Sequence, residues 1–284
     1  MALLAFAAIV LVSAAVLWLI GAREPACAIG KGDGPHWFIA VRGEAGRLGP
    51  GVAERLCTTS AFGFIGPDDA YWHRFIIAHG GDANTLPIDL SKAEDAYVAR
   101  VKLLRPPRLM FGMLRTLIAL GILGKPSGPI VQDVQSLNFR ADVMPGAGAI
   151  ARLLAQPASF APAMINFLAY KPQATYANGA ASIPGRLAYS RYGVVAMRTV
   201  YRTGGHLLFA GRVLAVLREA SAGPAVGRWD DMAAMQYPDP PAILSMEHAP
   251  DYRAALHHRD AGLERTLVIA SVRNHALASP PAHA

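Results

Sequence analysis

The chain has 284 residues, enough for one large domain or two small ones together with an anchor. It is 53% hydrophobic and only 17% charged, a balance that suits a chain with a membrane segment better than a fully soluble one. The net charge is +7, but the basic residues are scattered and form no aromatic–basic signature, so we expect no nucleic-acid partner. The two cysteines, Cys27 and Cys57, are too few to form a disulfide framework that stabilises the fold. We expect free thiols, or one disulfide if the body lies outside the cytoplasm.

Residues 2–20 form an uncharged apolar run that predicts a transmembrane helix, because about 20 such residues cross a bilayer. The alternative is a cleaved signal peptide with a small-x-small site around Cys27, but no charged side chain precedes the run. We therefore predict a single-pass anchor over 1–22 and a linker over 23–35. Basic residues follow the anchor, which favours a bacterial-type inner membrane with the body in the cytoplasm.

Residues 36–138 match no fold that the pattern identifies. Residues 36–41 predict a short strand, and 52–58 predict a short helix. Ser91, with a glutamate three residues later, has capping-box spacing and predicts an amphipathic helix over 92–104.

The apolar segment 109–123 is short for a membrane span. Basic residues flank it on both sides. We favour a buried or interfacial helix over a second span.

The C-terminal part has a clearer pattern. Its elements are a strand at 163–170, a helix at 186–202, strands at 206–217 and 232–237, a helical region opened by Pro240-Pro241, and a strand at 266–272. This order predicts an α+β, ferredoxin-like βαββαβ domain of the dimeric α+β barrel type over 139–274, before a disordered tail at 275–284. Such a sheet leaves one apolar face uncovered, so we expect a homodimer that pairs sheet against sheet.

The same region resembles a known family in its segments MINFLAYKPQATYANG, GRLAYSRYG, GGHLLFAGRV, WDDMAAMQYPDPPAILSM and DYRAALHHRDAGLERTLVIA. These are similar to the domain of unknown function 1330 family, which belongs to the dimeric α+β barrel superfamily. The resemblance covers about residues 139–273, less than half of the chain. It implies the fold and, by analogy, a ligand cleft between helices and sheet. It implies no particular reaction, since the superfamily includes monooxygenases, haem-handling proteins and aromatic-degradation enzymes.

Three residues are candidates for catalysis. His258 and Arg259 belong to the densest titratable cluster, and they suit proton transfer and anion binding respectively. The alternative is a polar helix face that supports the fold. His206 follows a glycine pair at a strand start, where it would line the cleft mouth or cap an edge.

Four residues are candidates for ligand binding. Asn166 is an amide within an apolar strand, so it either bonds backbone or contacts a ligand. Tyr189 and Tyr192 share one helix face and suit packing with their hydroxyls directed at a partner. Arg212 alternates with apolar residues, which would direct it to the cleft or the dimer interface.

We find no Walker loop, GxSxG or HExxH motif, and we predict neither a metal nor a cofactor. The sequence favours a membrane-anchored dimeric protein that binds a small apolar or amphipathic molecule. The alternatives are an enzyme of monooxygenase or isomerase type and a structural membrane-associated dimerisation subunit.

Overall fold

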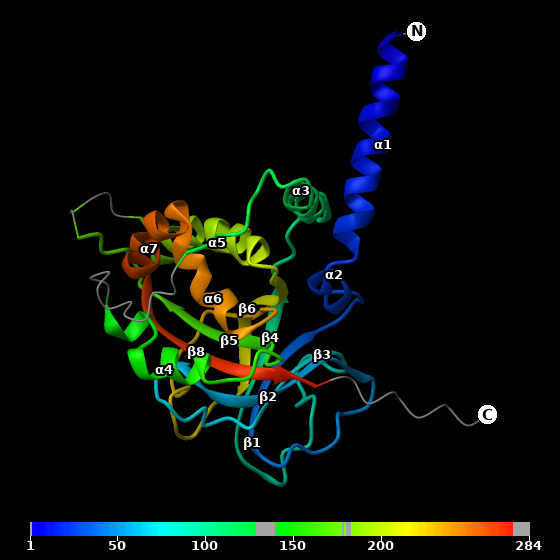
Figure 1. Cartoon of the computed structure of the whole chain (residues 1–284). Coiled ribbons are helices and arrows are strands. Elements are labelled where there is room, and N and C mark those ends of the chain that lie inside the picture. The colour runs from blue at the N-terminus through cyan, green and yellow to red at the C-terminus, as the bar shows by residue number, and fades with distance from the viewer. Residues whose placement is uncertain (1, 129–139, 178, 180–182, 275–284) are drawn as a thin grey trace.

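The computed structural model describes residues 2–128, 140–177, 179 and 183–274, and its centre is a closed barrel of eight strands (Figure 1). The strands are β1 His36–Gly43, β2 Val52–Ile65, β3 Arg74–Gly80, β4 Ala93–Leu103, β5 Pro162–Tyr170, β6 His206–Arg218, β7 Asp231–Gln236 and β8 Leu263–Arg273. Around the barrel the order is β1–β3–β2–β8–β5–β7–β6–β4, and β4 pairs again with β1. All of these pairs are antiparallel.

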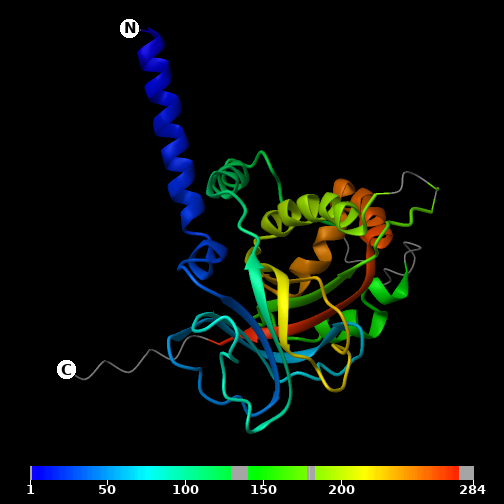
Figure 2. The same cartoon turned by 180° about the vertical axis from the view of Figure 1, so that it is seen from behind.

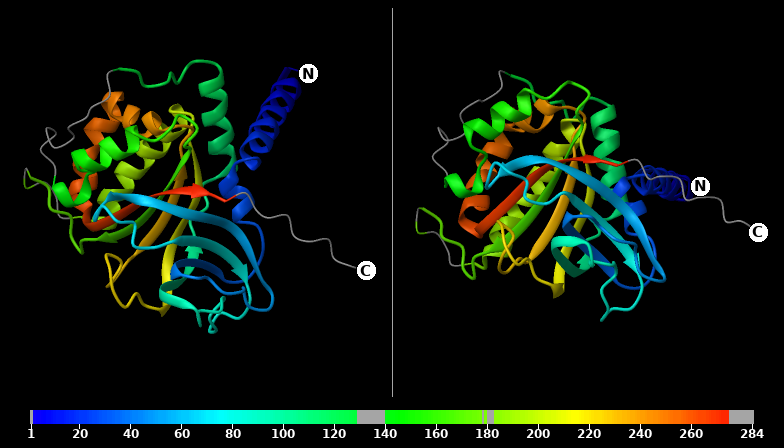
Figure 3. Two further views of the ribbon diagram at one scale, coloured as in Figure 1. Left: turned by 60° about the horizontal axis from the view of Figure 1, so that its bottom comes forward. Right: turned by 90° about the horizontal axis from the view of Figure 1, so that it is seen from below.

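Strands β1–β4 form the N-terminal half of the barrel, and β5–β8 form the C-terminal half. The halves meet at two seams, where β4 pairs with β6 and β2 pairs with β8. Figures 2 and 3 show these seams from behind and from below. Closure leaves neither half with an unpaired edge strand, which would otherwise be a site for aggregation.

The helices are distributed unequally over the two halves. They are α1 Ala2–Ala22, α2 Pro25–Ile29, α3 Arg108–Ala119, α4 Ala147–Leu154, α5 Gly185–Arg202, α6 Pro240–Leu244 and α7 Pro250–Gly262, with short 3₁₀ turns η2 Ala141–Val143 and η3 Ser245–His248. Helices α5 and α7 pack side by side over the outer face of the C-terminal half (Figure 1). The outer face of the N-terminal half is covered by loops instead, which are held together by a bridge between Leu48 and Ile88.

Aromatic side chains from both halves fill the barrel interior. Phe167 of β5 lies at its centre, with ring centroids 5.2 Å from Phe38 of β1, 5.9 Å from Tyr97 of β4 and 5.4 Å from Trp229. Phe38 and Phe167 are both fully buried. The two halves therefore share one core, and neither can bury its inner face alone.

This arrangement corrects the predicted fold class. The elements of the C-terminal half lie where the sequence pattern placed them, but they do not form a free-standing ferredoxin-like sheet with an open face. Their inner face is covered by β1–β4 of the same chain, within a closed eight-stranded antiparallel barrel. The predicted homodimer was to bury an uncovered face of the sheet, and β1–β4 cover that face instead. Homodimerisation stays a prediction. Residue 139 and the predicted tail at 275–284 lie outside the described residues.

Two predicted helices in the N-terminal half are strands. Residues 52–58 belong to β2, and most of 92–104 belongs to β4. The capping-box spacing at Ser91 was misleading because β4 is buried on both faces: Tyr97 points into the barrel, whereas Val98 packs against the outer loops. Burial on both sides obscures the alternation that marks a strand.

The predicted membrane anchor is also corrected. Residues 1–22 were assigned to it, and α1 does occupy this region. Yet across the described parts of the chain, no helix combines the length and apolar character needed to cross a membrane. The membrane localisation based on this segment is therefore wrong. Most of α3 lies within the segment 109–123, and this helix buries Phe111 and Leu114 against the body of the protein.

Helices α1 and α3 touch backbone to backbone. A Cβ atom on Gly112 would lie 1.7 Å from the carbonyl oxygen of Leu17, and one on Gly21 would lie 1.8 Å from that of Arg108. Only glycine permits so close an approach. The guanidinium of Arg108 also lies 4.7 Å from the ring centroid of Trp18.

An ion pair between buried Glu24 and partly exposed Arg115 fixes α3 to the rest of the molecule. Glu24, which is 5% exposed, accepts hydrogen bonds from Arg115 of α3 at 2.7 Å and from the Tyr201 hydroxyl of α5 at 2.9 Å. The Arg115 guanidinium also lies 4.4 Å from the centroid of the Tyr201 ring. The start of the chain thus determines where α3 lies relative to α5.

We predict that Phe38→Ala destabilises both halves of the barrel together, by about 3–5 kcal/mol, because it removes a ring from the shared core. Hydrogen–deuterium exchange should show faster exchange in peptides from β5–β8 as well as from β1–β4. Phe6→Ala, at an exposed position of α1, is the matched control and should change neither. Unchanged protection in β5–β8 would contradict a shared core.

Candidate functional site

A cavity of about 1050 Å³ lies between the outer face of the C-terminal half and the helices that cover it. Strands β5, β6 and β7 supply one wall, α5 and α3 supply the opposite side, and α6, η3 and α7 close it further along. Aromatic rings fill the barrel interior among the described residues. The site is therefore outside the barrel, in the helix–sheet layer.

The cavity collects the chain's methionines and tyrosines. Seven of the nine methionines line it: Met110, Met113, Met144, Met164, Met197, Met235 and Met246. Six of the nine tyrosines do so as well: Tyr170, Tyr189, Tyr192, Tyr201, Tyr237 and Tyr252. Methionine is flexible and polarisable and adapts to irregular apolar shapes, whereas tyrosine adds a hydroxyl to an apolar ring.

Local sequence periodicity places these side chains. In β5, alternate residues face opposite ways, so Met164, Asn166 and Leu168 reach the cavity while Ile165 and Phe167 enter the barrel. In α5, Tyr189, Tyr192 and Ala196 follow three- and four-residue spacing and share the inner face.

The tyrosines form a continuous ring cluster. Centroids of Tyr170 and Tyr189 are 5.2 Å apart, those of Tyr189 and Tyr192 are 5.3 Å apart, and the Tyr192 and Tyr252 hydroxyls are 3.2 Å apart. Burial raises the pKa of Tyr170, Tyr189 and Tyr252 above the ordinary tyrosine value. These three side chains therefore stay neutral phenols that can donate hydrogen bonds.

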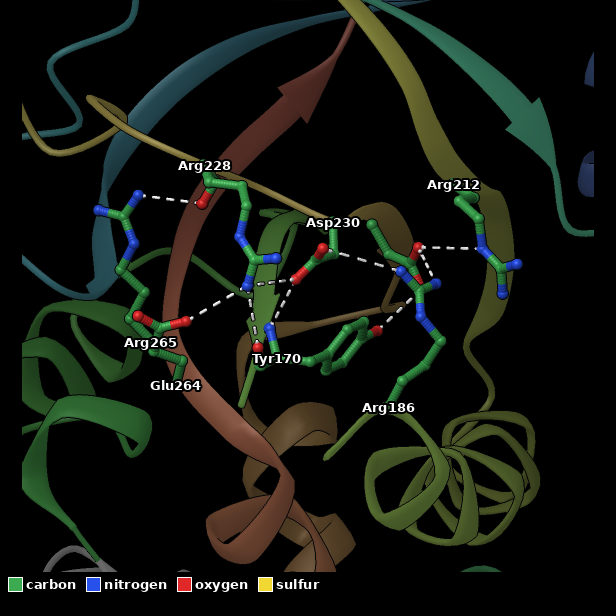
Figure 4. A network of polar contacts seen from close by, with 8 residues as sticks. Tyr170, Arg186, Arg212, Arg228, Asp230, Glu264 and Arg265 are labelled. Atoms are coloured by element: carbon green, nitrogen blue, oxygen red, sulfur yellow. Dashed lines mark hydrogen bonds and ion pairs between the residues drawn. The ribbon is translucent and has the colours of Figure 1, made fainter. Parts of the chain in front are cut away.

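One edge of the cavity carries an arginine–aspartate network (Figure 4). Buried Asp231 accepts hydrogen bonds from Arg186 at 2.6 Å and from the Tyr170 hydroxyl at 2.9 Å, and Arg212 Nε lies 3.8 Å from it. The neighbouring Asp230 accepts a hydrogen bond from the Tyr170 backbone at 2.8 Å. The carboxylates are thus matched by cations and donors, which favours a structural role for this network.

Glu247 is an unmatched acid in the same cavity. Its side chain is 7% exposed, and no residue that the structure describes forms a hydrogen bond with its buried Oε2 atom. Burial raises the pKa of this carboxyl to about 7, against a weaker lowering by Arg253. A buried carboxyl oxygen without a partner costs stability, which makes Glu247 a candidate contact for a ligand.

Arg259 is a nearly buried cation in the cavity, at 6% exposure. Its Nη1 donates to the Met144 sulfur at 3.4 Å, a weak acceptor, and its guanidinium lies 5.8 Å from the Tyr192 ring centroid. None of the carboxylates in the described chain forms an ion pair with it.

The structure brings together five of the seven residues selected from the sequence. Asn166, Tyr189, Tyr192, Arg212 and Arg259 all line the cavity. Asn166 also donates to the carbonyl of Met164 at 2.9 Å, so its amide is partly satisfied by backbone. Whether these residues bind a ligand stays a prediction.

The two selected histidines do not line this cavity. His258 Nδ1 lies 2.8 Å from the Tyr176 hydroxyl, and burial together with His257 lowers its pKa. His206 is partly buried at the start of β6, and burial lowers its pKa as well. Both histidines therefore favour the neutral form. Neither of them lines the cavity.

Sequence reasoning missed Glu247, Arg186 and the methionines of α3. A glutamate between Met246 and His248 in a proline-rich helical region carries no signal of burial. The available hint was Met110 and Met113, spaced three residues apart in an apolar segment, which could have marked a cavity wall. Within the described ranges, no three His, Cys, Asp or Glu side chains are placed to hold a metal ion.

Comparisons with known proteins give two similar solved structures. One is the methylated RPA0582 protein, 25% identical over 48% of this chain and 97% of that one, with a TM-score of 0.41. The other is RPA0582, a protein of unknown function from Rhodopseudomonas palustris, 27% identical over 49% of this chain and 98% of that one, with a TM-score of 0.39. The sequence matches no protein-family model and no curated protein.

We predict that Glu247→Gln changes how stability depends on pH. In the wild type the unfolded carboxyl loses its proton near pH 4.5, whereas the folded one holds it until about pH 7. Stability should therefore fall as pH rises through this window, by at most about 3 kcal/mol, and level off above it. The variant has no carboxyl to ionise at this position, so its free energy of unfolding should not fall in this way. The difference in stability between variant and wild type should therefore grow in the variant's favour between pH 4.5 and pH 7.

Urea unfolding of both proteins across this range checks the prediction. Glu54→Gln, at an exposed position of β2, is the matched control, and the difference between its stability and that of wild type should not change with pH. A constant difference between Glu247→Gln and wild type at all pH values would show that Glu247 is not buried as described.

Proposed function

We propose that the protein binds a small apolar or amphipathic molecule in the cavity between α3, α5 and the C-terminal half of the barrel. One observation carries the proposal: a cavity of about 1050 Å³ collects seven of the nine methionines and six of the nine tyrosines. Ligand sites are commonly concave and mainly apolar, with a few polar groups that orient the ligand. Unmatched Glu247 and Arg259 are polar groups of that kind.

The lining favours adaptable recognition. Helix α3 and strands β5 and β7 each supply methionine side chains to the lining of the same space, so the walls can adjust to ligands of different outline. Membership of the domain of unknown function 1330 family and homodimerisation stay predictions, as do turnover of the ligand and a purely structural role.

Filling the cavity tests the proposal. Ala210 of β6 and Ala233 of β7 are directly opposite each other in register, and both line the cavity. We predict that the double variant Ala210→Phe/Ala233→Phe weakens binding of the neutral fluorophore N-phenyl-1-naphthylamine by about tenfold, because the two rings occupy the space it needs. Fluorescence titration measures the change.

Ala53→Phe is the matched control, since Ala53 is an exposed strand residue away from the cavity. It should bind the fluorophore like the wild type. Circular dichroism establishes that each variant is folded. A folded double variant with unchanged affinity, or a wild type that does not bind the fluorophore, would contradict the proposal.

A further inference from the structure

We propose that the cavity recognises an amphiphile with a carboxylate head group, and that Arg259 holds this head group. The inference rests on the proposed function and deepens it by assigning the ligand's chemical class. It starts from an imbalance of charge among the arginines that line the cavity.

Each of the other cavity arginines has a carboxylate nearby. Arg186 binds Asp231, Arg212 lies 3.8 Å from the same carboxylate, and Arg198 binds Asp251. Arg259 differs, because the described chain supplies it with no carboxylate and only the Met144 sulfur as acceptor. It is also more completely buried than the other three.

An unpaired buried guanidinium is costly. Taking such a cation out of water costs several kcal/mol unless an anion and further acceptors compensate it. Five N–H donors in a planar fork match the two oxygens of a carboxylate. Asp260, the next residue, accepts a hydrogen bond from the backbone of Arg140 instead. None of the described carboxylates therefore compensates Arg259, and we infer that a ligand supplies the anion.

The surroundings of Arg259 favour a carboxylate attached to an apolar body. Tyr189 and Tyr252 lie near it as neutral phenols and can donate to a second oxygen, and the Tyr192 ring lies 5.8 Å from the guanidinium. The methionine-lined space then accommodates the apolar remainder. A fully hydrated anion such as phosphate would leave this apolar wall uncovered.

Glu247 lines the same cavity, but its carboxyl does not prevent an anion from binding at Arg259. The two side chains form no ion pair, so they are separate polar points along the cavity wall. Because burial raises the pKa of Glu247 to about 7, its carboxyl is mostly protonated at slightly acidic pH and adds little repulsion.

The experiment compares decanoate with decan-1-ol, which share an alkyl chain and differ in head-group charge. Each competes with N-phenyl-1-naphthylamine on the full chain at about pH 6, where decanoate is ionised. We expect decanoate to bind wild type about tenfold more tightly than the alcohol, since hydrogen bonds to charged groups add this much. Arg259→Met should abolish the preference by weakening decanoate alone, and Arg259→Lys should retain part of it.

Arg191→Met is the matched control, because Arg191 is exposed on α5 and does not line the cavity. It should keep the wild-type preference. Equal binding of decanoate and decan-1-ol by wild type would overturn the carboxylate inference while leaving the cavity proposal intact. Failure of wild type to bind the fluorophore or the alcohol would contradict the cavity proposal itself.

The wild-type comparison stands even if Arg259→Met does not fold, since it needs no variant. Decylammonium extends it: a cationic head group should bind wild type more weakly than the alcohol. Binding of decylammonium as tight as that of decanoate would also overturn the inference.

Discussion

Closure of the barrel at the β4–β6 and β2–β8 seams is the constraint on which the rest of the structure depends. Without it, four strands on each side would expose an apolar inner face and two open edges. Phe167 and Phe38 meet at the centre because the seams bring the halves together. Aromatic rings fill the interior, and the large cavity lies outside the barrel, beneath the helices.

The helix that completes this space is held from a distant part of the chain. Helix α3 supplies methionines to the cavity wall, yet its position is set by Glu24, through Arg115 and Tyr201, and by glycine contacts with α1. The first 30 residues therefore act on the site without lining it. This link explains why a segment far from the cavity in sequence belongs to the same structural unit.

The sequence predicted well where burial was one-sided and boundaries were marked by proline or glycine. Helix 186–202 is of this kind, and Tyr189 and Tyr192 share the face that its spacing indicated. Strand 163–170 is buried on both faces, and the prolines that bound it marked its position. Strand β4 was assigned as a helix because burial on both faces hides its period. Barrel closure and the placement of α3 or Glu247 depend on contacts between distant residues, which local patterns do not encode.

The unequal covering of the two halves has a consequence for stoichiometry. Helices lie over the outer face of the C-terminal half, whereas loops bridged by Leu48 and Ile88 cover that of the N-terminal half. A barrel made of two equivalent halves would carry a pair of symmetry-related chambers, and occupancy of one could influence the other. Within the described residues, one large helix-covered chamber lies over the C-terminal half. A single chain should therefore bind one ligand there along a simple hyperbola, and any cooperativity would have to come from contacts between chains.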